Sequence, residues 1–235
     1  MTILNIETST SCCSAAITIN GEAVAAKANL SGANHASELP VFIEQLLHEA
    51  TLNGWKLDAV ALSQGPGSYT GLRIGASTAK GICYGLNIPL IPVDTLQVLC
   101  AQAIAEQEYA ADSLLCPMLD ARRMEVYAAL YHPTTLQPLT DVKAIIIDEQ
   151  SFQEELAQKT IHFFGNGSDK CQSVLTSPNA SFIKNIVPDA RYMGKLAEEQ
   201  YSQKALDIKQ VAYYEPFYLK EFVAAPSRIK GLETK

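Results

Sequence analysis

The chain has 235 residues, of which 48% are apolar and 18% charged, and its formal charge is −7. This composition is typical of a soluble globular protein of one or two domains, and it excludes collagen, coiled-coil and disordered classes. Residues 1–100 hold four basic against seven acidic side chains and residues 101–235 hold 14 against 18. With no basic half, we do not expect the chain to bind nucleic acid by itself.

The N-terminal residues and the cysteines indicate a cytoplasmic protein. An acid, Glu7, follows the start without a basic region before it, and no apolar window reaches the ~18 residues of a membrane span. We therefore expect no secretion signal and no membrane partner. The six cysteines form no C-x-x-C pair and the four histidines form neither H-x-x-x-H nor H-E-x-x-H. We expect buried thiols and no metal site.

The first half of the chain predicts alternating strands and helices. Three strands come first, and Asn20-Gly21 supplies the turn between the second and third. From Ser37 to Ala50 the apolar residues recur at helical spacing. A glycine-rich turn then interrupts a short strand before a helix that ends near Tyr84. The predicted strands are 3–7, 13–19, 22–30, 59–62 and 88–93, and the predicted helices are 37–50, one that follows the glycine-rich turn and ends at about 84, and 95–107.

The second half begins with a pattern that resembles the first. When the chain is shifted by 113 residues, the hairpin 3–17 aligns with 116–130 without a gap, and each copy reads strand, acid, polar turn, strand. Either this is a chance likeness of two hairpins or the chain contains a duplicated α/β lobe with a carboxylate at a cleft. The other predicted elements are a strand at 162–165 and helical segments at 151–159, 168–175, 189–201 and 216–225.

The segment 65–85 contains six of the 13 glycines. Each glycine inside a helix costs roughly 0.5–1 kcal/mol relative to alanine, so some local role must offset them. Gly71 and Gly75 share one helix face, which favours close packing against another helix. The alternative is an anion site at the helix N-terminus, with Arg73 in the first turn. The spacing fits neither a P-loop nor G-x-G-x-x-G.

The acids at the two hairpins are candidates for chemistry. Asp120 and Glu7 could serve as a general base and a magnesium ligand across a cleft, whereas the alternative is a turn-capping or salt-bridged acid beside Arg122 and Arg123. Hydroxyl side chains near the turns lack a G-x-S-x-G context. A nucleophilic hydrolase therefore lacks support.

Five segments of the chain are informative when they are taken together. They are Ile3-Leu-Asn-Ile-Glu7-Thr8-Ser9, Asn34-His35-Ala-Ser37-Glu-Leu39-Pro40, Gly65-Pro-Gly-Ser-Tyr-Thr-Gly-Leu-Arg73-Ile-Gly75, Asp120-Ala-Arg122-Arg-Met-Glu125-Val-Tyr127 and Glu215-Pro-Phe-Tyr218-Leu. Together they resemble the TsaB (YeaZ) family, whose members take part in bacterial tRNA threonylcarbamoyladenosine synthesis. The resemblance spans nearly the whole chain, and its glycine-rich segment is the most specific part.

The resemblance implies an α/β fold of the actin-like ATPase class, also called ribonuclease H-like, with two α/β lobes. We expect residues 1–100 to form the first lobe, with the C-terminal segment 210–235 packing on it, and residues 101–209 to form a second, smaller and degenerate lobe. The family is the non-catalytic paralogue of the metal-containing TsaD subunit. We therefore expect a scaffold and activator that positions this catalytic paralogue for modification of position 37 of tRNA.

The resemblance also implies partners and an interface. We expect a heterodimer with the paralogue, a small ATPase of the TsaE type, tRNA reached through the complex, and a homodimer when the partner is absent. In the family the first two helices pack on the same helices of the partner. The predicted helical seam consists of Leu39, Phe42, Ile43, Leu46, Gly71, Leu72, Gly75 and Ala79.

The nucleotide site of the actin-like fold is in doubt in this sequence. Actin-like kinases carry Asp-x-Gly in the phosphate-binding hairpin, where this chain has Glu7-Thr8-Ser9. We expect no intrinsic cofactor, with ATP or ADP only at an interface in the complex. The alternatives are a stand-alone actin-like ATP-dependent kinase and a metal-dependent glycopeptidase-like hydrolase. Candidate anion contacts are Glu7, Thr8, Ser9, Ser68, Thr70, Arg73 and Asp120.

Overall fold

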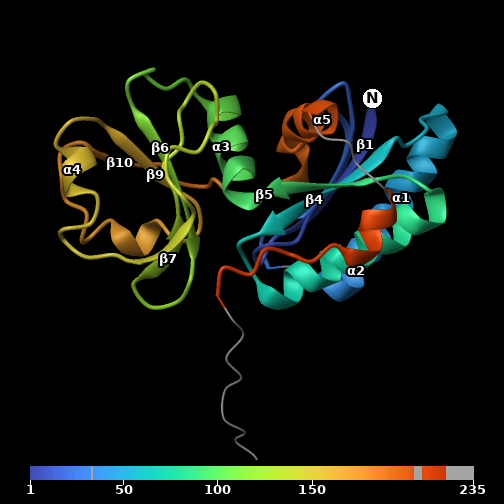
Figure 1. Cartoon of the computed structure of the whole chain (residues 1–235), viewed down its shortest axis with the longest axis horizontal. Helices are drawn as coiled ribbons and strands as arrows, with labels where there is room; N and C mark the ends of the chain where they lie inside the picture. The colour runs from blue at the N-terminus through green and yellow to red at the C-terminus, as the bar shows by residue number, and fades with distance from the viewer. Residues whose placement is uncertain (33, 204–207, 221–235) are drawn as a thin grey trace, which may run out of the picture.

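The computed structural model describes residues 1–32, 34–203 and 208–220. Two α/β lobes lie side by side, and each is built on one five-stranded sheet (Figure 1). A helix, α3 (Thr95–Glu106), lies between them and packs on strands of both sheets. The two-lobe architecture expected from the resemblance is therefore confirmed.

The first sheet has the strand order β3-β2-β1-β4-β5. β1 pairs with β2 and β2 with β3 in antiparallel fashion, whereas β1, β4 and β5 run parallel. The sheet is nearly completely buried at its centre, as expected for short apolar strands covered on both faces. Its strands are β1 (Thr2–Glu7), β2 (Cys13–Ile19), β3 (Glu22–Asn29), β4 (Ala59–Gly65) and β5 (Leu90–Asp94).

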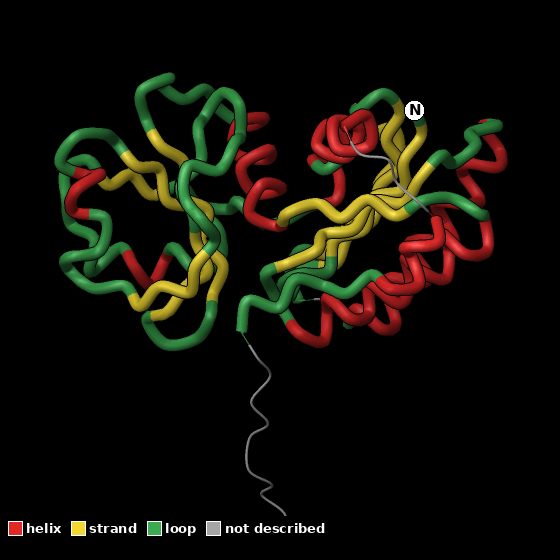
Figure 2. The backbone as a smooth tube through the Cα atoms, in the orientation of Figure 1, coloured by secondary structure: helices red, strands yellow, loops and turns green. Residues whose placement is uncertain are grey.

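Helices cover both faces of the first sheet (Figure 2). On one face lie α1 (His35–Asn53) and α2 (Tyr69–Leu86), which also contact each other. α5 (Gly194–Gln203) and the helical turn η2 (Ala190–Tyr192) lie on the other face, against β5 and β2. Glu7 and the turn that follows it therefore sit at the end of the central strand, beside the start of α2.

The second sheet repeats the order of the first, as β8-β7-β6-β9-β10. β6 occupies the place of β1, pairing antiparallel with β7 and parallel with β9. The predicted duplication of the hairpin is thus confirmed, because the aligned hairpins are central in both sheets. The strands are β6 (Leu114–Asp120), β7 (Glu125–Ala128), β8 (Lys143–Ile146), β9 (Ile161–Phe164) and β10 (Ala180–Phe182).

Three apolar clusters form the core. One fills the space between α1, α2 and the first sheet, one lies within the second lobe, and the largest joins the lobes through α3. Tyr131 of the second lobe donates a hydrogen bond to Asp94 Oδ1 of the first at 3.2 Å. All six cysteines are buried and free, as expected, and burial raises the pKa of the Cys83 thiol to about 12.

Several elements differ from the sequence prediction, mostly in the second lobe. The helix predicted at 151–159 is a single turn, α4 (Gln153–Leu156), and 168–175 holds only a 3₁₀ turn, η1 (Asp169–Cys171). β8 and β10 were not predicted, because these three- and four-residue edge strands show little alternation. The described part of 216–225 is not helical, and residues 221–235 lie outside the described residues.

The chain returns to the first lobe earlier than the predicted boundary at 209. η2 and α5, which we assigned to the second lobe, pack on the first sheet, where Ala190 N donates to Ser14 Oγ at 2.9 Å. The reason is that the first sheet would otherwise expose an apolar face, which α5 covers. Beyond it, η3 (Ile208–Tyr213) packs along α2.

Candidate functional site

The turn between β1 and β2 is packed directly against the start of α2. A side chain at Gly67 would collide with the Ser9 carbonyl oxygen, and one at Gly71 with the Thr8 carbonyl oxygen. Ser68 N donates to Ser9 O at 2.6 Å. These glycines therefore allow close packing inside the lobe, but the element that they approach is the turn after β1 and not another helix, as the sequence pattern had indicated.

The residues predicted to form the helical seam face the interior of their own lobe. Leu39, Leu46 and Ala79 are fully buried, and Ile43 and Leu72 are at most 5% exposed. Gly71 and Gly75 point at the turn after β1. Half-buried Phe42 packs against the same core. The predicted seam is therefore wrong at the level of residues, because the apolar face of an amphipathic helix first covers its own sheet.

The outward faces of α1 and α2 carry a different set of residues. Gly81 and Gly85 are exposed, and a side chain at either would meet nothing in the described chain within 4 Å. Tyr84 is 89% exposed between them, and Val41 of α1 is 45% exposed. A shallow groove of about 470 Å³, the α1–α2 groove, is lined by Ala36, Pro40, Tyr69, Thr70, Arg73, Ile74, Ser77 and Thr78.

Behind the turn lies a buried carboxylate. Glu7 is fully buried, and its Oε1 accepts a hydrogen bond from Ser9 N at 2.5 Å. Desolvation by burial raises the pKa of the Glu7 carboxyl above its ordinary 4.5. Glu7 Oε2, Thr8 Oγ1 and Ser9 Oγ have no hydrogen-bond partner among the described residues. Glu7 and Thr8 are thus fully buried, and neither lines the cleft that Asp120 lines.

We expect Glu7→Gln to remove a pH dependence of stability. Because the pKa of Glu7 is higher in the folded chain than its ordinary 4.5, the folded state binds more protons and loses stability as pH rises above that value. The loss is about 1.4 kcal/mol of unfolding free energy per pH unit, up to the folded pKa. Urea unfolding should show that the free energy of unfolding falls more between pH 5.0 and 7.5 for the unchanged chain than for the variant. Parallel pH profiles would contradict this account.

A polar cleft of about 290 Å³ separates the two hairpin turns. It is lined by Ser9, Thr10, Ser11, His35, Gly67, Ser68, Leu119, Asp120 and Asn166. His35 Nε2 bonds Cys12 O at 2.9 Å, which fixes the ring at the rim. Ser68 caps α2 by accepting from Gly71 N at 3.2 Å. The cleft therefore has equivalent turns from both lobes on its opposite walls.

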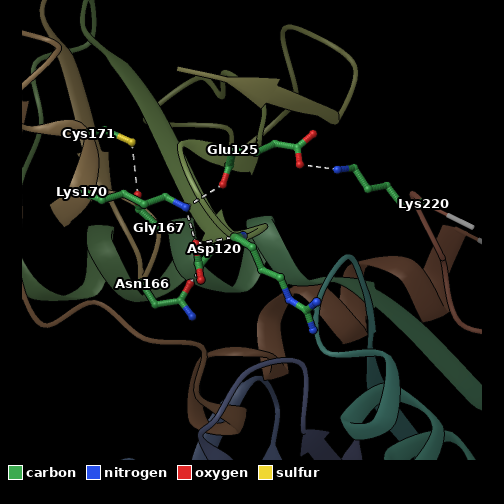
Figure 3. Close-up of polar contacts among 8 residues, drawn as sticks. Asp120, Glu125, Asn166, Gly167, Lys170, Cys171 and Lys220 are labelled. Carbon is green, nitrogen blue, oxygen red and sulfur yellow. Dashed lines mark hydrogen bonds and ion pairs between the residues drawn. The ribbon is translucent and has the colours of Figure 1, made fainter. Parts of the chain in front are cut away.

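Asp120 lies in a lysine-centred network (Figure 3). Lys170 pairs with Asp120 Oδ1 and donates to Glu125 O at 2.7 Å, and Arg122 N donates to Asp120 Oδ1 at 3.1 Å. Asn166 Oδ1 accepts from Asp120 N at 3.0 Å. Of the two interpretations of Asp120, the structure supports the paired acid, although its partner is Lys170, which sequence spacing did not suggest.

The candidate anion contacts divide into three groups. Ser9, Ser68 and Asp120 line the interlobe cleft, whereas Glu7 and Thr8 are buried behind it. Thr70 and Arg73 face the α1–α2 groove instead. Within the described ranges, no three His, Cys, Asp or Glu side chains are placed to hold a metal ion, and no helix is long and apolar enough to cross a membrane.

Comparison with known proteins places the chain in a family. The family model described as "TsaD: tRNA N6-adenosine threonylcarbamoyltransferase" matches residues 26–226. A Haemophilus influenzae protein named tRNA threonylcarbamoyladenosine biosynthesis protein TsaB is 31% identical over 236 residues, which is 95% of each chain. The chain belongs to the TsaB family.

Further relatives agree with this membership. TsaB of Bacillus subtilis is 34% identical over 131 residues, covering 56% of this TsaB-family chain and 55% of the relative. The solved structure of YeaZ from Pseudomonas aeruginosa superposes with a TM-score of 0.77 at 24% identity, over 93% of this chain and 99% of that one. The two-lobe α/β fold of this chain is therefore that of a YeaZ structure.

Proposed function

We propose that this TsaB-family chain is a non-catalytic scaffold and activator in the synthesis of threonylcarbamoyladenosine at position 37 of tRNA. Its role is to bind and position a catalytic, metal-containing paralogue of the same fold. Family membership supports the pathway, because the relatives are named for this biosynthesis. The closed turn at Glu7 and Thr8 supports a chain that does not work as a free-standing kinase.

The observation that supports this proposal most directly is the set of exposed residues on the outward face of α2. Gly81 and Gly85 lie within the helix, and each costs roughly 0.5–1 kcal/mol relative to alanine. Unlike Gly71, they allow no close contact within the described chain. A helix of a partner that packs closely on this face would account for both, with Tyr84 and the α1–α2 groove completing the surface.

The same surface defines the assembly that we propose. The paralogue would lay its first two helices on the outward faces of α1 and α2, and a second copy of this chain would occupy them when the paralogue is absent. A small ATPase joins the heterodimer, and tRNA reaches the chain through the complex. ATP or ADP would bind only at a surface completed by the partner.

Reconstituted threonylcarbamoylation tests this role. Unmodified tRNA is incubated with the cognate synthase, the catalytic paralogue and the small ATPase, with or without this chain. We expect modified tRNA to disappear when the chain is omitted and to return when it is added back. Full activity without the chain would overturn the proposal, as would activity of the chain with ATP and no paralogue.

A further inference from the structure

The segment 208–218 runs beside α2 (Figure 1). A second groove lies between this segment and α2, on the other side of Arg73 from the α1–α2 groove. It encloses about 360 Å³ and is distinct from the α1–α2 groove, although Tyr69, Arg73 and Ser77 form a rim common to both. We call it the tyrosine groove. Its lining consists of Tyr69, Arg73, Ala76, Ser77, Lys80, Tyr214, Glu215, Pro216 and Tyr218.

Three aromatic rings form the walls of the tyrosine groove. The rings of Tyr69 and Tyr218 are 5.1 Å apart between centroids and are inclined by 41°. Tyr214 comes from the same segment as Tyr218, and its buried hydroxyl has no hydrogen-bond partner among the described residues. Among the described residues, no Leu, Ile, Val, Met or Phe side chain lines it. An apolar helix or acyl chain would therefore gain little here.

Two cations stand beside these rings. The Arg73 guanidinium lies 5.1 Å from the centroid of the Tyr69 ring and donates to Tyr69 Oη at 2.5 Å. Lys80, two turns later on α2, donates to Ala212 O at 3.0 Å. Neither forms an ion pair with a carboxylate within residues 1–32, 34–203 and 208–220. Glu215 is the one acid among the described residues that line the groove, so these residues carry positive charge in a chain of net charge −7.

Aromatic rings next to arginine and lysine are the chemistry that binds unpaired nucleotides. Bases stack on tyrosine rings whatever their identity, and the cations hold the phosphates. A groove of about 360 Å³ is too small for a double helix but large enough for one unstacked nucleotide. We propose that the tyrosine groove binds a single unpaired nucleotide of the substrate tRNA, with its base against the tyrosine rings and its phosphate near Arg73 and Lys80. This inference rests on the proposed function.

The groove contributes to tRNA binding and does not carry it alone, because the acidic chain repels a polyanion elsewhere. The test therefore uses the assembled complex with the paralogue and measures the anisotropy of labelled, unmodified tRNA. Tyr218→Ala should weaken binding about 5- to 100-fold, the effect of losing one stacked base. Tyr218→Phe keeps the aromatic ring, and the complex that contains it should bind tRNA as tightly as the complex with the unchanged chain. Tyr213→Ala is the matched control, because Tyr213 is 86% exposed in the same segment and does not line the groove.

The dependence of tRNA affinity on salt concentration distinguishes a contact with a phosphate from a purely structural role of Lys80. Lys80→Gln keeps a donor for Ala212 O but removes the charge, and it should lower the slope of log affinity against log salt by about 0.7. Lys143 is an exposed lysine on the edge strand β8, so Lys143→Gln should leave the slope unchanged.

Unchanged tRNA affinity for Tyr218→Ala in an intact heterodimer would overturn the groove assignment alone, because the omission experiment tests the scaffold role separately. Saturable binding of AMP that Tyr218→Ala abolishes, with tRNA affinity unchanged, would overturn the RNA assignment in favour of a free nucleotide.

Discussion

Gly71→Ala should destabilise the first lobe by about 2 kcal/mol, although alanine is the better helix former. The added methyl group would collide with the Thr8 carbonyl oxygen, which is backbone and cannot rotate away. Either α2 or the turn after β1 must shift, although Thr8 of the turn and Leu72 of α2 are buried where the two elements meet. For a chain of this length the change corresponds to a fall in melting temperature of roughly 4–8 °C. Urea and thermal unfolding monitored by circular dichroism provide the measurement.

Gly81→Ala is the matched control, because it makes the same substitution in the same helix. At Gly81 the methyl group would meet open space. The variant should therefore be more stable than the unchanged chain by roughly 0.5–1 kcal/mol. If the two substitutions change the free energy of unfolding in opposite directions, Gly71 is needed for close packing on the turn after β1 and Gly81 is not needed for the fold. Equal stabilisation by both would contradict the packing of α2 on the turn.

The succession of strands and helices in the first lobe could be predicted from its sequence, because hydrophobic periodicity and turn residues there favour the same elements. The apolar series of 37–50, the Asn20-Gly21 turn and the short apolar strands each favour one structure, and packing does not override them. In the second lobe, the helices predicted at 151–159 and 168–175 are only the single turns α4 and η1. Elements this short contain too few residues for hydrophobic periodicity to define them. The shifted hairpin could still be recognised because β6 is the central strand of its sheet and is buried from Leu114 to Leu119.

One signal in the sequence was missed. Gly65-Pro66-Gly67-Ser68 after β4 has a counterpart, Gly165-Asn166-Gly167-Ser168, after β9. In each lobe the turn packs against the hairpin after the central strand, since a side chain at Gly167 would press on Leu119 and Asp120. Gly65 and Gly165 both adopt positive φ, at 114° and 97°. This repeat would have indicated that the glycines serve a turn common to both lobes.

The candidate site was harder to predict than the fold, for a physical reason. An apolar helix face identifies what the helix buries but not whether the covering surface belongs to the same chain or to a partner. Leu39 and Leu46 therefore gave the same pattern that an interface would give. Exposed glycines inside a helix are the more discriminating signal, because intramolecular packing does not require them. Gly81 and Gly85 were visible in the sequence, but only the structure shows that they face outward.

Gly81→Arg should weaken the heterodimer with the catalytic paralogue at least 100-fold while leaving the fold intact. A long charged side chain on the outward face of α2 would hold a partner helix away and bury an unpaired charge, which costs about 3 kcal/mol or more. The substitution removes a helix glycine, so the isolated chain should keep or gain stability. Sizing chromatography with light scattering and calorimetric titration of the paralogue measure the association, and threonylcarbamoylation should fall in parallel.

Ala105→Arg is the matched control for that substitution. Ala105 is exposed near the end of α3, away from the outward faces of α1 and α2, and it receives the same charge in a helix. Association and activity should match those of the unchanged chain. If Gly81→Arg also leaves the heterodimer unchanged, the outward face of α2 is not the partner surface, and the two exposed glycines need another explanation. If both variants lose association equally, added positive charge and not the position is the cause. Loss with Gly81→Arg alone would place the partner's helix on the side of α2 that faces away from its own sheet.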